Sequence, residues 1–141
     1  MNPAQLDTAL RAHKIWLNSG GQRGKRADLS FLDLRGASLN EADLTRALLI
    51  GTNLRETSLN RAVLRGAFMP LCNLSGASLH DADLSDAKLM GAILCNTDMR
   101  STGLEGADLS GAMLEGALLP EQPDQGKSRL MIVEVILIKR V

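Results

Sequence analysis

The residues with the clearest catalytic potential gather around one histidine. His80 is followed closely by Asp81 and Asp83, and serines stand at positions 78 and 85. Histidine, carboxylate and serine are the groups of a hydrolytic triad, in which the imidazole activates the hydroxyl. Such chemistry also requires a concave pocket and donors for a developing oxyanion. The prediction therefore depends on the elements that carry these residues.

Metal and disulfide chemistry has little support in the composition. Two cysteines, Cys72 and Cys95, and two histidines are too few for a disulfide framework, or for a structural zinc site without carboxylates. No metal and no cofactor is expected. The chain carries 16 basic and 16 acidic residues, so its formal net charge is zero. This balance disfavours direct binding of nucleic acid.

The elements themselves follow from an internal repeat. From Ala27 to Glu121 the chain divides into 19 consecutive units of five residues, without insertion or deletion. The third residue of a unit is Leu in 17 units and Met in two, and the first is Ala in 13. The second is Asp, Asn or Ser in 11 units, and eight units end in Gly. A repeat this regular specifies the architecture before any propensity is considered.

A period of five fits neither a helix nor an extended strand, so each unit must contain a bend. If each unit forms one side of a coil, its third and first residues point inward and the others face water. Glycine in the fifth position then supplies a corner that tolerates positive φ. Asp and Asn in the second position are interpreted as groups that hydrogen-bond the backbone at bends, rather than as metal ligands.

The tandem A(D/N)LXX pattern resembles the pentapeptide-repeat proteins, over 95 of the 141 residues. The resemblance implies a mainly β fold, a right-handed quadrilateral β-helix with four units in each coil of 20 residues. Nineteen units then make about 4.75 coils, a rod roughly 23 Å long at about 4.8 Å per coil. Pro70 and Pro120 depart from the pattern and leave their turn types open.

The remaining segments are predicted to cover the ends of the rod. In residues 1–26, Asn2 and Pro3 mark a helix start and Gly20 a stop, so residues 3–18 are expected to form a capping helix. Its apolar face includes His13 and Trp16, interpreted as part of the cover and not as a ligand site. In residues 122–141 a polar linker precedes Leu130–Ile138, whose β-branched residues favour a strand. This strand is expected to cover the rod's end or an apolar side, within one chain or exchanged with a partner.

The side formed by the first unit of each coil is unusually apolar. We predict that it is a candidate interface, whose outward residues are Phe31, Leu48, Ile50, Phe68, Pro70, Leu71 and Met90. A contiguous apolar surface of this kind marks a packing or binding site. Three interpretations remain open: docking of the C-terminal segment, a homodimer, or a different protein partner.

Acidic residues gather on the third and fourth sides of the middle coils. This candidate acidic patch comprises Asp81, Asp83, Asp86, Asp98 and Glu105. Residues 67–126 have a net charge of −7, whereas residues 1–66 have +4. Some pentapeptide-repeat proteins resemble duplex DNA and bind DNA gyrase, and a matching charge density over three coils would need about eight negative charges. The basic half argues against such mimicry.

The predicted function is therefore a non-enzymatic binding or scaffold module, with a DNA-mimicking gyrase-binding protein as the alternative. A convex rod offers no pocket for the residues around His80, so no enzyme is expected. Its protein partner is unknown, and the acidic patch or the apolar side would provide the contact. The sequence shows no signal peptide and no apolar run of membrane-spanning length, so a cytoplasmic location without membrane contact is expected.

Overall fold

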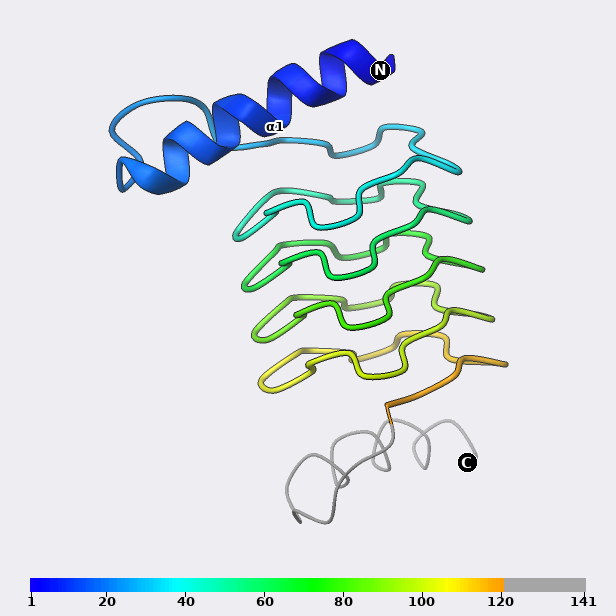
Figure 1. Ribbon diagram of the computed structural model, residues 1–141. Helices are drawn as coiled ribbons and strands as arrows, with labels where there is room; N and C mark the ends of the chain where they lie inside the picture. Colours follow the sequence, from blue (N-terminus) through cyan, green and yellow to red (C-terminus); the bar gives the residue numbers. More distant parts are fainter. Residues whose placement is uncertain (121–141) are drawn as a thin grey trace.

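The chain forms a stack of four-sided coils, as the computed structural model of residues 1–120 shows (Figure 1). Parallel bridges join second-position residues 20 apart in four series, which begin at Asp28, Asp33, Ser38 and Asp43. Within residues 1–120 no strand is longer than one bridge residue, because every side bends again after five residues. The predicted linker and the segment Leu130–Ile138 lie outside the described residues, as does Glu121, so the number of coils stays a prediction.

The interior of the stack is a set of leucine ladders, as predicted. Third-position residues of the inner coils, such as Leu59, Met69 and Leu79, are fully buried. The small first-position residues fit beside them, and buried threonines there hydrogen-bond to the adjacent coil. Thr52 Oγ1, for example, donates to the carbonyl of Leu29 at 2.9 Å. Each coil is thus held to the next by apolar contact and by hydrogen bonds that no water can replace.

The corners of the coils adopt a left-handed backbone. All eight fifth-position glycines have positive φ, which confirms the prediction, and ten other residues in this position share it. At Arg46, with φ of 58°, the following Ala47 N–H donates to the carbonyl of Leu44 at 2.9 Å. Positive φ at the third residue of such a hydrogen-bonded turn is the requirement of a type II turn. The corner geometry is therefore set by the repeat and not by glycine alone.

The glycines have a second role where large side chains lie along the rod. A Cβ on Gly51 would approach Phe31 Cδ1 to 3.0 Å, and one on Gly91 would approach Leu71 Cδ2 to 2.8 Å. Phe31 and Leu71 therefore occupy the space that glycine leaves in the following coil. This packing fixes the two largest exposed apolar side chains against the corner.

One helix, α1, spans Pro3–Asn18, the range that the sequence predicts, and lies across the first coil (Figure 1). Asn2 begins it with a capping box: Asn2 Oδ1 accepts from Gln5 N at 2.8 Å, and Gln5 Oε1 accepts from Asn2 N at 2.9 Å. Leu6 and His13 are buried against the stack. The helix thus covers part of the open leucine ladder at the N-terminal end.

The loop after α1 returns very close to the helix. Gly24 has φ of 73°, and a Cβ there would lie 2.3 Å from Ala12 O and 2.6 Å from Trp16 N. The next residue, Lys25, donates its N–H to Ala12 O at 3.1 Å. Only glycine allows the backbone to approach a helix backbone this closely.

His13 is a buried connector between the helix and the stack. Its Nδ1 accepts from Ala27 N–H at 3.0 Å, so Nε2 carries the proton and donates to the Thr45 carbonyl at 3.1 Å. Its ring stacks on Trp16, with centroids 5.5 Å apart. Both ring nitrogens are satisfied in the neutral form, which confirms His13 as part of the cover.

Burial lowers the pKa of His13 more than the Thr45 hydrogen bond and the nearby Asp43 raise it. The unfolded chain takes up this proton near pH 6.5, before the folded chain does. The stability that His13 contributes is therefore complete above about pH 6.5 and is lost as the pH falls toward the lower folded pKa. We expect the denaturation midpoint to fall between pH 7.5 and 5.

Two substitutions isolate this effect. His13→Gln should flatten the fall of the midpoint between pH 7.5 and 5. His80→Gln should preserve it, because the His80 side chain is 49% exposed. Denaturant titrations followed by Trp16 fluorescence give the measurement. An equal slope in the wild type and in His13→Gln would contradict the assignment.

Candidate functional site

The apolar first side is accessible at two corners. Phe31 and Leu71 are 78% and 67% exposed, values far above those of any ladder residue. The other predicted interface residues are half-buried: Leu48, Ile50, Phe68, Pro70 and Met90. Leu48 and Phe68 belong to the bridge series that begins at Asp28, so the structure brings the predicted residues onto one side. We call these seven residues the apolar surface.

The apolar surface sits on a rigid backbone. Leu49 N–H donates to the Phe68 carbonyl at 2.8 Å, and Phe68 N–H donates to the Ala47 carbonyl at 2.9 Å. Pro70 stands as the second residue of its turn, a position that proline favours. The exposed Lys88 interrupts the series below Phe68. The result is a flat side that presents side chains without an accessible backbone edge.

Further exposed apolar residues lie near the end of the stack opposite α1. Met113 and Leu118 are 48% and 51% exposed, and Ile93, one coil above Met113, is half-buried. All three stand in the second position, where most units have Asp, Asn or Ser. That departure from the repeat was the available signal, and the sequence analysis did not use it.

The acidic patch is partly neutralised by its own neighbours. Arg100 donates to both oxygens of Asp98, at 2.9 and 2.8 Å, and these hydrogen bonds hold the Asp98 pKa at about 2. Asp83 accepts from Ser85 and lies 3.8 Å from Arg65 Nε. Asp81, Asp86 and Glu105 are exposed. The charge that an approaching molecule meets is therefore smaller than the sequence count implies.

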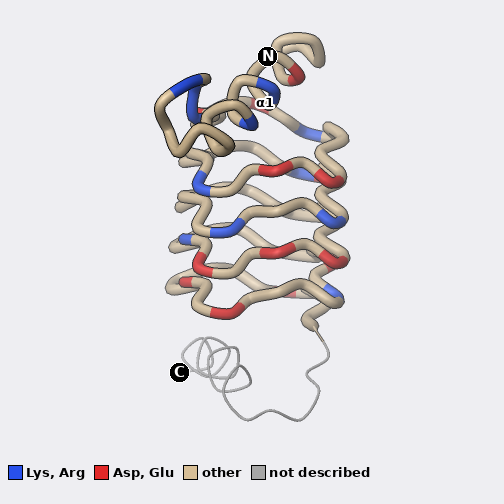
Figure 2. The backbone as a smooth tube through the Cα atoms, turned by 60° about the vertical axis from the view of Figure 1, so that its left-hand side comes forward, with Lys and Arg blue, Asp and Glu red and all other residues tan. Residues whose placement is uncertain are grey.

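Charge also varies along the rod. Lys and Arg gather at α1 and the loop after it, whereas Asp and Glu prevail in the lower coils of the face in view (Figure 2). Residues 67–120 contain two basic and seven acidic residues. The described structure is thus dipolar, with a basic covered end and an acidic far end.

The residues around His80 do not assemble as a triad. His80 Nε2 lies 3.4 Å from Asp81 Oδ2, whereas Asp83 accepts from the Ser85 backbone and hydroxyl. No hydrogen bond between a serine hydroxyl and His80 is formed within residues 1–120. These side chains instead serve the turns of their own units.

A hydrogen-bond ladder on the third side differs from expectation. Asn60 was expected to be an ordinary outward residue with little effect on stability. Its Oδ1 instead accepts from His80 N–H at 3.1 Å and from the Ser78 hydroxyl, and its own N–H donates to Asn40 Oδ1 at 2.9 Å. Removing this amide would leave donors in two coils without their acceptor, a larger loss than an ordinary surface site carries.

The two cysteines are free, as the register predicts. Cys72 is buried in a first position, and burial raises the pKa of its thiol to about 12. Cys95 is half-buried in an outward position. No cluster of three or more metal-ligating side chains occurs in the described part of the chain.

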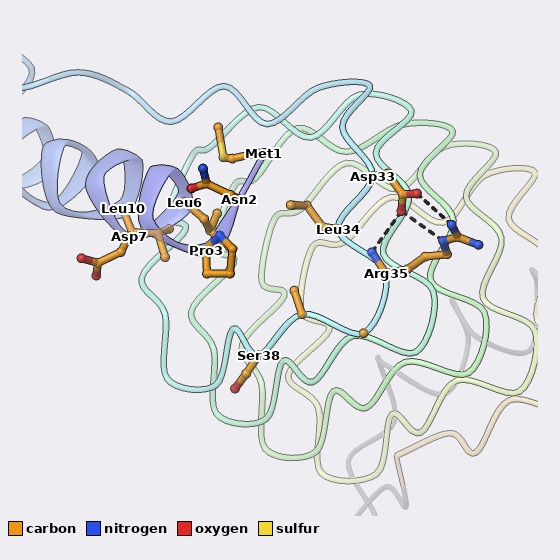
Figure 3. A pocket seen from close by; sticks show the side chains of 12 residues that line it. Met1, Asn2, Pro3, Leu6, Asp7, Leu10, Asp33, Leu34, Arg35 and Ser38 are labelled. Carbon is orange, nitrogen blue, oxygen red and sulfur yellow. Dashed lines mark hydrogen bonds and ion pairs between the residues drawn. The ribbon is translucent and has the colours of Figure 1, made fainter.

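A groove remains where α1 covers the first coil incompletely. It has a volume of about 550 Å³ and lies between the start of α1 and residues 33–38 (Figure 3). Leu6, Leu10 and Leu34 form its apolar lining, while Asp33 and Arg35 pair on its rim at 3.0 Å. Because the charged groups on the rim satisfy one another, none is directed at a ligand.

Comparison with known proteins identifies the family. The family described as pentapeptide repeats matches residues 27–66, 57–95 and 72–119, with 8 copies, so the chain belongs to the pentapeptide-repeat family. Among the curated proteins none matches the sequence significantly. Within residues 1–120 no helix is long and apolar enough to cross a membrane.

Solved structures of the family share the architecture. A pentapeptide repeat protein from the Arabidopsis thaliana thylakoid lumen has a TM-score of 0.71 and 25% identity, covering 84% of this chain and 86% of its own. Rfr23 from the cyanobacterium Cyanothece 51142 has a TM-score of 0.50 and 33% identity, covering 71% and 69%. The described stack is therefore a pentapeptide-repeat β-helix.

Proposed function

We propose that this chain is a non-enzymatic binding or scaffold module that contacts a protein partner through the apolar surface. The observation that carries the proposal is the exposure of Phe31 and Leu71, 78% and 67%, on a side whose backbone is already fully engaged. Large apolar side chains held rigidly at the surface provide the anchors of protein interfaces, since little entropy is lost on binding.

The chemistry of the apolar surface favours a protein over nucleic acid or membrane. Lys88 is the one basic residue among the first-side units between Asp28 and Ser110. Phosphate backbones are bound by clusters of Lys and Arg, which this side lacks. A second copy of the chain or a different protein are both partners of this kind.

A matched pair of variants tests the proposal. Leu71→Asp places a charge in the apolar surface, whereas Ser101→Asp makes the same addition at an exposed corner of the third side. Both positions have nearly equal φ, 58° and 57°, so the backbone cost is matched. We expect the full-length Leu71→Asp protein to lose the partner that the wild type captures from its source cell, and Ser101→Asp to retain it.

The outcome also identifies the kind of partner. Light scattering that shows a dimer in the wild type and a monomer in Leu71→Asp would assign the surface to a second copy. Equal capture of the same partner by both variants would contradict the proposal, because the contact would then lie elsewhere on the rod.

The alternative, a DNA-mimicking gyrase-binding protein, rests on the acidic patch. Two of its five members are engaged by arginines, since Asp98 pairs with Arg100 at 2.8 Å and Asp83 lies beside Arg65. These contacts lower the exposed negative charge below the density of duplex DNA. The geometry therefore supports the apolar surface better than the acidic patch.

We expect this protein neither to inhibit gyrase supercoiling at low micromolar concentration nor to protect gyrase from a quinolone. Supercoiling assays with and without the drug give the measurement. Protection that disappears when Asp81, Asp86 and Glu105 are neutralised together would reverse the order of the two functions.

A further inference from the structure

The end of the stack opposite α1 presents a row of backbone donors. In the inner coils each third-position N–H donates to a second-position carbonyl of the following coil, as Leu94 does to Met113 at 2.7 Å and Met99 to Leu118 at 2.8 Å. The last coil has no following coil among residues 1–120. The N–H groups without an acceptor in that range belong to Leu104, Gly106, Leu109, Gly111, Leu114 and Gly116. Such a row is a template for a strand.

The same end is apolar. Leu104, Leu114 and Leu119 are only partly buried, although the corresponding Leu84 one coil above is fully buried. Met113 and Leu118, 48% and 51% exposed, add apolar area at its margin. An edge that combines open backbone donors with exposed leucines is costly in water and needs a cover.

The chain itself leaves the stack at this end. After Pro120 it continues for 21 residues, which include the apolar segment Leu130–Ile138. These residues cannot form one more coil in register. The four units after Glu121 would place Asp124, Arg129, Glu134 and Lys139 in the third position, where every unit of the rod has Leu or Met.

A strand with its own register fits the open end better. Side chains alternate along a strand, so one face of the segment would carry Met131, Val133, Val135 and Leu137, all apolar. The opposite face contains Glu134, which suits the solvent. Nine residues are nearly two pentapeptide units, enough to follow two sides of the last coil.

We propose that Leu130–Ile138 pairs with the open edge of the last coil of its own chain, with the Met131, Val133, Val135 and Leu137 face toward the leucine ladder. The linker of nine residues, 121–129, spans up to about 30 Å, enough to reach any side of the last coil. On the first side the strand would gain no backbone hydrogen bonds, since Leu49 and Phe68 already use theirs. The end of the rod offers both.

Amide hydrogen exchange on the full chain tests the pairing. Val135→Asp puts a charge on the inward face, and Ile136→Asp makes the same kind of change on the outward face. We expect Val135→Asp to speed exchange at Leu104, Leu109 and Leu114 at least tenfold. Ile136→Asp should leave these rates within about twofold of the wild type. Exchange at Leu64, in an inner coil, should stay the same in both.

Three outcomes would overturn the proposal: fast exchange at Leu104, Leu109 and Leu114 in the wild type, equal effects of the two substitutions, or a dimeric mass that Val135→Asp converts to a monomer. The last result would show exchange of the strand between chains. Truncation after Gln125 provides a second measurement, in which the three amides should exchange as in Val135→Asp. Because Leu71 lies outside this contact, loss of the pairing leaves the test of the apolar surface unaffected.

Discussion

Leu59→Ala is expected to lower the free energy of unfolding by about 2 to 5 kcal/mol, and Leu79→Ala by a similar amount. Both leucines are fully buried, stacked one above the other in the third-side ladder. The adjacent coils are tied by hydrogen bonds above and below, for example from Leu59 N to Ser78 O at 2.8 Å, so the cavity has little freedom to collapse. Denaturant unfolding, followed by circular dichroism, gives the measurement.

Arg55→Ala is the matched control for this prediction. Arg55 is an exposed fourth-position residue whose backbone atoms alone make hydrogen bonds in the described structure. An ordinary surface substitution changes stability by less than about 0.5 kcal/mol. Equal losses at Leu59 and Arg55 would show that the inward register is wrong.

Gly24→Ala is expected to detach α1 from the first coil. The left-handed backbone alone costs an alanine about 1 to 2 kcal/mol. The new Cβ would also stand 2.3 Å from Ala12 O, and backbone atoms cannot rotate out of the way as a side chain can. Trp16 is the one tryptophan of the chain, and its ring lies against His13 and near Arg46. Its fluorescence should shift to longer wavelength as the helix moves away.

Gly20→Ala separates the two contributions. Gly20 also has positive φ, 64°, but a Cβ there would meet no atom within 4 Å. We expect a lower denaturation midpoint with unchanged Trp16 fluorescence in the native state. Identical behaviour of the two variants would mean that the close approach at Gly24 contributes nothing.

The fold could be predicted almost completely because the repeat constrains it locally and globally at once. Leucine every five residues excludes the regular helix and strand, and the small first residue leaves room for two inward side chains per side. The bridge from Leu48 to Phe68, 20 residues apart, shows the expected pairing directly. The helix could be predicted from Asn2 and Gly20, since a cap and a stop act through local backbone hydrogen bonds.

What the sequence did not predict depends on contacts between coils. Leucine at position 71 has no intrinsic preference for positive φ, yet it adopts 58° because the turn and the coil below demand it. The role of Asn60 was missed for a similar reason, since its partners Ser78 and Asn40 lie 18 and 20 residues away. Propensity rules describe a residue in its own unit and not in a stack.

The candidate site was predictable in its position but not in its accessibility. The register places Phe31, Phe68 and Leu71 on one side, and the structure does the same. That Phe68 is half-buried while Phe31 is 78% exposed follows from packing across coils, which residue types alone do not specify. The acidic patch shows the same limit, because the bidentate contact of Arg100 with Asp98 removes charge that a residue count retains.

The four-series pairing makes the arrangement of surfaces around the rod depend on the number of units alone. Removing one unit between Leu32 and Gly66 would keep leucine in every inward position, yet turn all later coils by one side relative to α1. Phe68 and Leu71 would then continue the side of Asp43 and lie apart from Phe31. Removing four units would shorten the rod by a coil and restore the alignment. Insertions and deletions in multiples of five can therefore assemble or divide a binding surface while the interior stays the same.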